Sequence, residues 1–93
     1  MNGSVVRVPP GTGWVERDGV VYAARLPDGP PLVLAGPGAL VWHAVVPGGA
    51  LDEVVARVAT ATGESAGAVR AGVEGFVAGL VDAGVVVVAP AAD

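Results

Sequence analysis

Residues 14–34 have the sequence WVERDGVVYAARLPDGPPLVL, in which two Asp-Gly dipeptides separate three apolar runs. The dipeptides Asp18-Gly19 and Asp28-Gly29 favour the positive φ angles that tight hairpin turns require. Each flanking run is short and contains the Val, Leu, Trp or Tyr residues that pack well on a pleated surface. This part of the chain therefore predicts a three-stranded antiparallel meander, with strands at 14–17, 20–26 and 31–34.

Alternation along the second strand predicts which of its side chains face the core, because successive side chains point to opposite faces. The apolar face is expected to consist of Val20, Tyr22, Ala24 and Leu26. The third strand follows Pro30 and Pro31, which cannot donate a main-chain hydrogen bond. We therefore expect the third strand at an edge of the sheet.

From Gly38 onward the apolar residues recur with a helical period. They predict helices at 39–46, 51–62 and 66–83. Gly63 provides a stop for the second helix and Ser65 an N-cap for the third. The segment 85–89, in which four of the five residues are β-branched valines, predicts a fourth strand or an extended segment that packs back on the domain, and Val5–Val8 can pair as an extra strand.

These elements predict an α+β domain that is winged helix-turn-helix-like. It has an N-terminal three-stranded antiparallel β-meander followed by three α-helices and a short β-rich C-terminal tail. A chain of 93 residues has room for one domain. We expect that single domain to span 1–93, with an ordered core at about 14–88.

The composition excludes most kinds of active site. Cysteine and lysine are absent and histidine occurs once, as His43. Thiolate metal sites, iron–sulfur clusters, Schiff-base chemistry and a histidine-based triad are therefore not expected. His43 is better explained as a packing or surface residue. We expect no enzyme and no cofactor.

Charge and hydropathy bear on the partners. The net charge of −4 argues against nucleic acid, since phosphate binding needs clustered basic residues. The uncharged span 29–51 is long enough to cross a bilayer, but four prolines would break such a helix. The N-terminus lacks the basic stretch and the following apolar segment of a secretory signal peptide, so we expect no such signal. We expect a cytoplasmic protein without a membrane partner.

Three glycines of the third helix fall on one face. Gly72, Gly75 and Gly79 are three and four residues apart, and each costs about 1 kcal/mol relative to Ala in a helix interior. One interpretation is a smooth surface that lets a partner approach closely. The other is codon-driven composition on a solvent-exposed face, and the sequence leaves both open.

Three segments resemble the PqqD-like family, the recognition elements of ribosomally synthesised, post-translationally modified peptides (RiPPs). They are LAGPGALVW at 34–42, LDEVVARV at 51–58 and VRAGVEGFVAGLVDAGV at 69–85. The resemblance covers about residues 14–88. It implies a winged-helix-like domain that binds the leader segment of a precursor peptide in natural product biosynthesis.

In that family the leader adds as a strand beside the third β-strand and packs its side chains over the last helix. Carried onto this chain, the resemblance implies peptide-binding residues on the edge strand and on the third helix: Leu32, Val33, Leu34, Val69, Arg70, Val73 and Val77. The valines are also the residues that a core would use. Arg70 suits either an acidic leader residue or a surface pair with Glu74.

The resulting functional hypothesis is a non-catalytic peptide-binding adaptor. Its partners would be the leader and a RiPP maturation enzyme, namely a radical SAM maturase, a cyclase or a leader peptidase. One alternative is a winged-helix DNA-binding regulator, although Arg70 is the only basic residue of the third helix. Another is a protein–protein interaction module, including a homodimer through the same surface.

Overall fold

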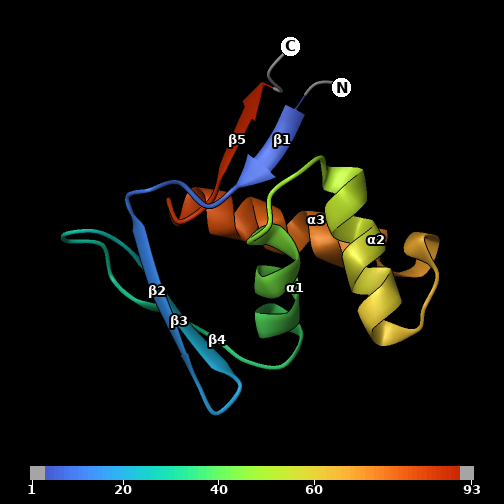
Figure 1. Cartoon of the computed structure of the whole chain (residues 1–93), viewed down its shortest axis with the longest axis horizontal. Helices are drawn as coiled ribbons and strands as arrows, with labels where there is room; N and C mark the ends of the chain where they lie inside the picture. Colours follow the sequence, from blue (N-terminus) through green and yellow to red (C-terminus); the bar gives the residue numbers. More distant parts are fainter. Residues whose placement is uncertain (1–3, 91–93) are drawn as a thin grey trace.

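The computed structural model describes residues 4–90 (Figure 1). The limits 1 and 93 of the predicted domain lie outside these residues. The elements in chain order are β1 Ser4–Arg7, β2 Thr12–Arg17, β3 Val20–Arg25, β4 Leu32–Leu34, α1 Pro37–Val45, α2 Leu51–Thr62, α3 Ala66–Asp82 and β5 Val87–Pro90. An antiparallel sheet of order β2-β3-β4 lies on one side of the helices, and β1 pairs with β5 beyond them.

The β2–β3 hairpin has the predicted two-residue turn. Asp18 has φ 54° and Gly19 has φ 80°, so both central residues are left-handed. This is the type I′ geometry whose twist matches that of the flanking strands. The turn places Arg17 opposite Val20 and fixes the register of the remaining pairs. The predicted three-stranded meander is confirmed.

The predicted inner face of β3 is wrong. Val21 and Ala23 are buried, whereas Tyr22 and Leu26 are exposed. The buried set shares its alternation with the charged Arg25 at the end of the strand, so alternation alone favours the other, wholly uncharged set. Val21 pairs with the buried Leu34 across the sheet, and this packing against the helices selects the face.

The connection from β3 to β4 also differs from the prediction. Gly29 is absent from the described residues with positive φ, so Asp28-Gly29 does not form a left-handed hairpin turn. The chain instead makes a wider loop, in which the Gly29 amide donates to the Arg25 carbonyl at 2.6 Å. A Cβ on Gly29 would lie 2.5 Å from that oxygen, so the glycine permits the close approach. β4 begins directly after Pro31.

The helices follow their predicted ends closely. α1 begins at Pro37, two residues before the predicted start, because proline suits the first helical position. α2 ends at Gly63, which has φ 74°, as predicted. The Ser65 hydroxyl accepts a hydrogen bond from the Ala68 amide at 3.2 Å and caps α3, also as predicted. Arg57 of α2 donates to the carbonyl of Ala44 at 2.8 Å and ties α2 to the last turn of α1.

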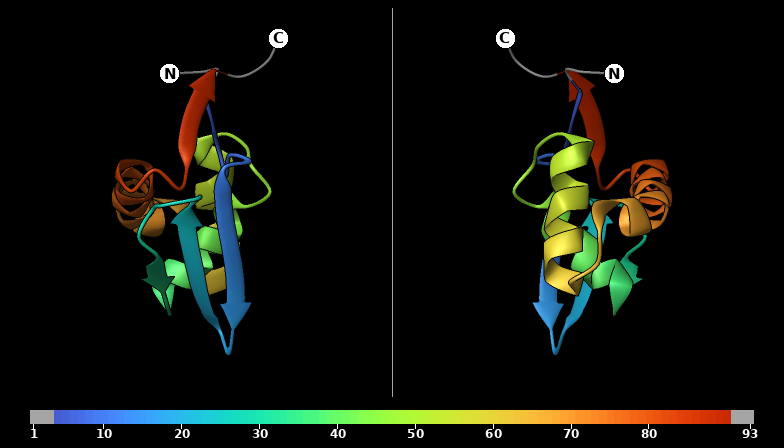
Figure 2. Two further views of the ribbon diagram at one scale, coloured as in Figure 1. Left: turned by 90° about the vertical axis from the view of Figure 1, so that its left-hand side faces the viewer. Right: turned by 90° about the vertical axis from the view of Figure 1, so that its right-hand side faces the viewer.

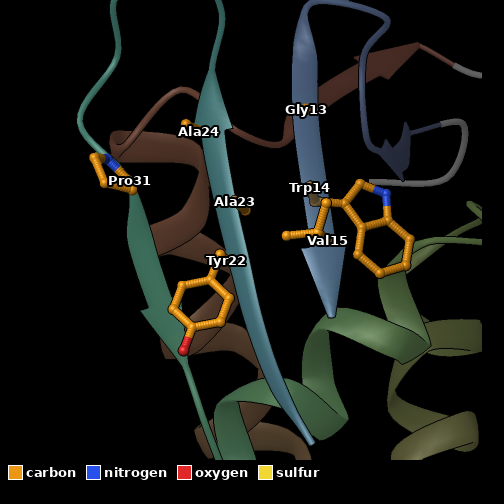
Figure 3. A pocket seen from close by; sticks show the side chains of 7 residues that line it. All are labelled: Gly13, Trp14, Val15, Tyr22, Ala23, Ala24 and Pro31. Carbon is orange, nitrogen blue, oxygen red and sulfur yellow. The ribbon is translucent and has the colours of Figure 1, made fainter. Parts of the chain in front are cut away.

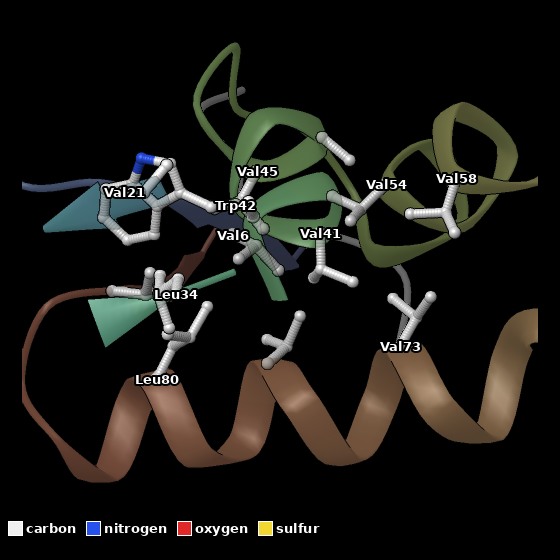
Figure 4. Packing of buried hydrophobic residues seen from close by; sticks show 14 of the residues in the cluster. Val6, Val21, Leu34, Val41, Trp42, Val45, Val54, Val58, Val73 and Leu80 are labelled. Carbon is white, nitrogen blue, oxygen red and sulfur yellow. The ribbon is translucent and has the colours of Figure 1, made fainter. Parts of the chain in front are cut away.

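The core lies between the inner face of the sheet and the three helices (Figure 4). Trp42 on α1 is its largest fully buried side chain. The Trp14 ring on β2 meets the Trp42 ring edge to face, with centroids 5.7 Å apart. From α3, Val73, Val77 and Leu80 complete the core.

The two ends of the described chain pair with each other. β1 and β5 are antiparallel, with Ser4 opposite Pro90 and Val6 opposite Val88. The Val6 amide also donates to the Gly49 carbonyl at 2.7 Å, so β1 holds the α1–α2 connection in place. This pairing confirms the extra N-terminal strand, and the buried Val85 and Val86 confirm that the tail packs back on the domain.

Candidate functional site

One edge of the main sheet is formed by β4. Within residues 4–90, β4 pairs with β3 and has no strand on its other side. Leu34 is buried, Leu32 is half-buried, and Val33 points away from the core and is exposed. The edge strand carries no charged side chain, so it lacks one of the features by which proteins keep further strands from adding.

The register determines which main-chain groups point out of this edge. In the two-residue β2–β3 turn, Arg17 and Val20 form a hydrogen-bonded pair, so the main-chain groups of Val20 and Tyr22 point toward β2. Those of Val21 and its neighbour Ala23 therefore point toward β4. Because Val33 lies opposite Tyr22, its N–H and C=O point away from β3, into the position where a further strand would pair.

The flank of α3 beside Phe76 is free of side chains. Gly72 and Gly79 lie four residues before and three residues after Phe76, so they flank it on the helix surface. A Cβ built on Gly72, Gly75 or Gly79 would have no heavy atom within 4 Å apart from the helix itself. The face predicted from the glycine spacing is therefore present, and no other described element covers it.

The edge of β4 and helix α3 lie on the same side of the molecule (Figure 2). In its left view, β4 is the outermost strand on the side where α3 is seen end-on. Figure 4 places Leu34 directly beside Leu80 of α3. Pro37, just after β4, and Phe76 are both at the rim of an apolar hollow of about 520 Å³ between the three helices.

The predicted apolar site residues fall into three groups. Leu32, Val33 and Leu34 form the sheet edge, as expected. Val69 lines the hollow between the helices. The remaining two valines, Val73 and Val77, are only 2% and 5% exposed and belong to the core. The sequence did not distinguish them from surface residues because both kinds lie on the apolar side of the same helix.

Arg70 lies on the α2 side of α3. Its guanidinium contacts Asp52 of α2 at 2.7 Å and Glu74 at 3.4 Å. The hydrogen bond to Asp52, and then the one to Glu74, raise the pKa of Arg70 above its ordinary value. The surface-pair interpretation thus accounts for Arg70, and the structure does not bring it next to the β4 edge.

His43 contacts a carboxylate from another element. Its Nε2 lies 3.1 Å from Glu16 Oε2, and its ring is 5.9 Å from that of Trp14. Both partners of the pair are well exposed. No serine or threonine hydroxyl in the described residues is recorded as bonded to His43, so the contact is explained as a link between α1 and β2.

The outer face of the sheet carries a feature that the sequence analysis did not identify. Val15, Tyr22 and Val33 lie opposite one another across the three strands and point away from the helices. Around Val15 and Tyr22 the face forms a shallow apolar surface that continues to Pro31 (Figure 3). The two-residue turn at Asp18-Gly19 aligns Val15 with Tyr22, so the row could have been found from sequence once the inner face was known.

Comparison with protein-family models, with curated proteins and with solved structures gives no match. Over residues 4–90, the geometry is that of a small α+β domain in which no strand lies beside the β4 edge and helix α3 carries a glycine flank. Among residues 4–90, no three His, Asp or Glu side chains gather where they could hold a metal ion. None of the helices over those residues has the length and hydropathy needed to cross a bilayer.

Proposed function

We propose that the protein is a non-catalytic peptide-binding adaptor of the PqqD-like, winged-helix-like kind. It captures the leader of a ribosomally synthesised precursor peptide as an added strand on β4 and presents the peptide to a separate maturation enzyme. The observation that carries the proposal is the outward orientation of the Val33 main chain on an uncharged edge, on the same side of the molecule as helix α3, which has an open glycine flank.

The chemistry of strand addition suits these residues. Main-chain pairing supplies affinity with little demand on sequence, and alternate side chains supply specificity. Side chains that face inward from the added strand would lie toward α3, where Phe76 offers an apolar contact and Gly72 and Gly79 offer space. A strand with two or three apolar anchors can reach micromolar affinity, about 8 kcal/mol.

The proposed partners come from the resemblance to the PqqD-like family. One is the leader peptide, and the other is a RiPP maturation enzyme such as a radical SAM maturase, a cyclase or a leader peptidase. The adaptor needs no catalytic group or cofactor of its own, because the enzyme supplies the chemistry. We place the complex in the cytoplasm, where ribosomal precursors are made.

Duplex DNA is the weaker alternative. In a winged-helix regulator α3 would enter the major groove and would need basic side chains. Arg70 is the only basic residue of α3, and it is held by Asp52 and Glu74. A DNA phosphate would have to displace both carboxylates.

The proposal is tested with a phage-displayed library of random twelve-residue linear peptides, selected on the immobilised protein. Enriched peptides are synthesised, and their Kd is measured by fluorescence anisotropy. Val33→Pro removes the outward N–H without breaking the ladder to β3, and it should weaken binding by about tenfold or more. Val33→Ala keeps the N–H and serves as the matched control, with a much smaller loss.

Far-UV circular dichroism establishes that both variants are folded. Two peptides, each N-methylated at one of the two alternating sets of residues, provide a second measurement on the unmodified protein. Methylation removes the peptide N–H groups that would donate to β4, so one of the two sets should weaken binding. The proposal is overturned if enriched peptides bind the folded Val33→Pro and Val33→Ala proteins equally well, or if N-methylation at every position leaves the Kd unchanged.

A further inference from the structure

The exposed row on the outer sheet face ends at the proposed peptide-binding edge. Val15 is 64% exposed, Tyr22 40% and Val33 64%, and the three stand in register across β2, β3 and β4. Apolar residues normally occupy the covered face of such a sheet. Here Val21, Ala23 and their neighbours already occupy the covered face, so the row forms a second apolar surface on the opposite face of the sheet.

The row runs perpendicular to the strands and ends at Val33, because β4 is the last strand of the sheet on that side. Any strand that pairs with β4 places one residue beside Val33, on the same face, as the fourth member of the row. Val33 is also the residue whose main-chain groups point out of the edge. A peptide that pairs with β4 would therefore place one of its residues at this end of the row.

We infer that the outer sheet face selects a β-branched or aromatic residue at the peptide position opposite Val33. The inference rests on the proposed function, and it adds a second specificity surface on the side of the sheet away from α3. Residues before and after that position would point to the inner face of the sheet, the side on which α3 and its partly buried Phe76 lie. The preferred segment thus has three consecutive apolar residues rather than an alternating pattern.

The face around the row supports an apolar ligand residue. On this face of the strands, the neighbours of the row are Gly13 with Ala24 on one side and Arg17 with Val20 on the other. Arg17 is the only charged member and stands at the turn, on β2, the strand farthest from the β4 edge. Favourable cross-strand pairs change affinity by roughly 1.5- to fivefold compared with alanine.

The experiment uses one enriched twelve-residue peptide and two protein variants. Val33→Thr and Val15→Thr make the same change in side chain at equally exposed positions at the two ends of the row, and only Val33 borders the ligand. Each peptide residue is replaced by Ala, and the Kd of every peptide is measured with each protein. The resulting double-mutant cycles isolate the coupling of each peptide position to each valine.

We expect Val33→Thr to couple to a single peptide position by about two- to fivefold, with the native residue there being Val, Ile, Thr, Tyr, Phe or Trp. Val15→Thr should couple to no position. The inference is overturned if no position couples to Val33→Thr, or if Val15→Thr produces the same coupling. It is also overturned if the row proves to be a contact between two copies, with the mass doubling at high concentration and both valine variants preventing it.

These results are distinguishable from failure of the proposed function. If strand addition itself is wrong, Val33→Pro and N-methylation leave peptide binding unaffected. If only the outer-face selection is wrong, Val33→Pro still weakens binding while the cycles at Val33 show no coupling.

Discussion

The backbone of Gly38 at the start of α1 lies against the ring of Phe76 on α3. A methyl group on Gly38 would stand 2.7 Å from Phe76 Cζ, closer than real Cβ atoms approach. The same ring lies beside Gly72 and Gly79 on the flank proposed to receive a peptide. Phe76 therefore contributes to the packing of α1 against α3 and also borders the candidate binding surface.

Gly38→Ala is expected to lower the free energy of unfolding by about 1–2 kcal/mol, because the added methyl overpacks the contact with Phe76. Gly75→Ala is the opposite case, since its Cβ meets nothing and alanine is the better helix former. It should raise stability by about 1 kcal/mol. Urea unfolding followed by circular dichroism measures both. Equal effects of the two substitutions would contradict the packing assigned to Gly38.

Gly79→Leu should block peptide binding without unfolding the protein. The new side chain would fill the space beside Phe76 into which the ligand is proposed to pack, and it meets no other element. Ala78→Leu is the matched control, because Ala78 is exposed and lies on a different side of α3. We expect at least a tenfold rise in Kd for Gly79→Leu and little change for Ala78→Leu. Similar affinities for the two variants would remove the glycine flank from the site.

Arg70→Ala should leave the Kd for peptide unchanged, because the guanidinium is engaged with Asp52 and Glu74 on the α2 side of α3. A group whose pKa is raised on folding adds stability that is lost only as the pH rises through the raised value. For Arg70 that value lies far above neutrality, so the variant and the parent should show parallel stability curves between pH 6 and pH 9. Urea midpoints across this range measure the comparison, and a loss of peptide affinity would return Arg70 to the site.

Trp42→Phe should be tolerated far better than Trp42→Ala. Trp42 is fully buried, and its Nε1 has no hydrogen-bond acceptor among the described residues. Phenylalanine removes that unpaired donor while retaining most of the ring, so we expect a change within about 1 kcal/mol. Alanine leaves a large cavity and should cost about 3–5 kcal/mol. Circular dichroism during urea unfolding is the measurement, because it does not depend on indole fluorescence.

Local signals were sufficient to predict most of the fold. The turn at Asp18-Gly19, the cap at Ser65 and the stop at Gly63 each rest on the backbone chemistry of one or two residues, whereas the same kind of signal at Asp28-Gly29 does not give a left-handed turn. The inner face of β3 could not be predicted in the same way. Val20 and Val21 are equally apolar, and the choice between them depends on Leu34, which is distant in sequence.

The candidate site was predictable in its edge strand and less so in its helix. Pro30 and Pro31 marked Leu32–Leu34 as an edge from the chemistry of proline alone. On α3, the sequence could not separate Val69, at the hollow, from Val73, in the core. They lie four residues apart on one helix face, and only the position of α1 and α2 decides which is covered.

The pairing of Ser4 with Pro90 brings the two ends of the fold to adjacent positions in one ladder. A few residues of linker would then close the chain into a ring without moving any element. Opening that ring between Asp18 and Gly19 gives a circular permutant in which β3 is the first strand and β2 the last. Because the new ends lie at the tip of the β2–β3 hairpin and not along β4, the permuted protein should keep the same binding surface while carrying its fusion partners at that tip.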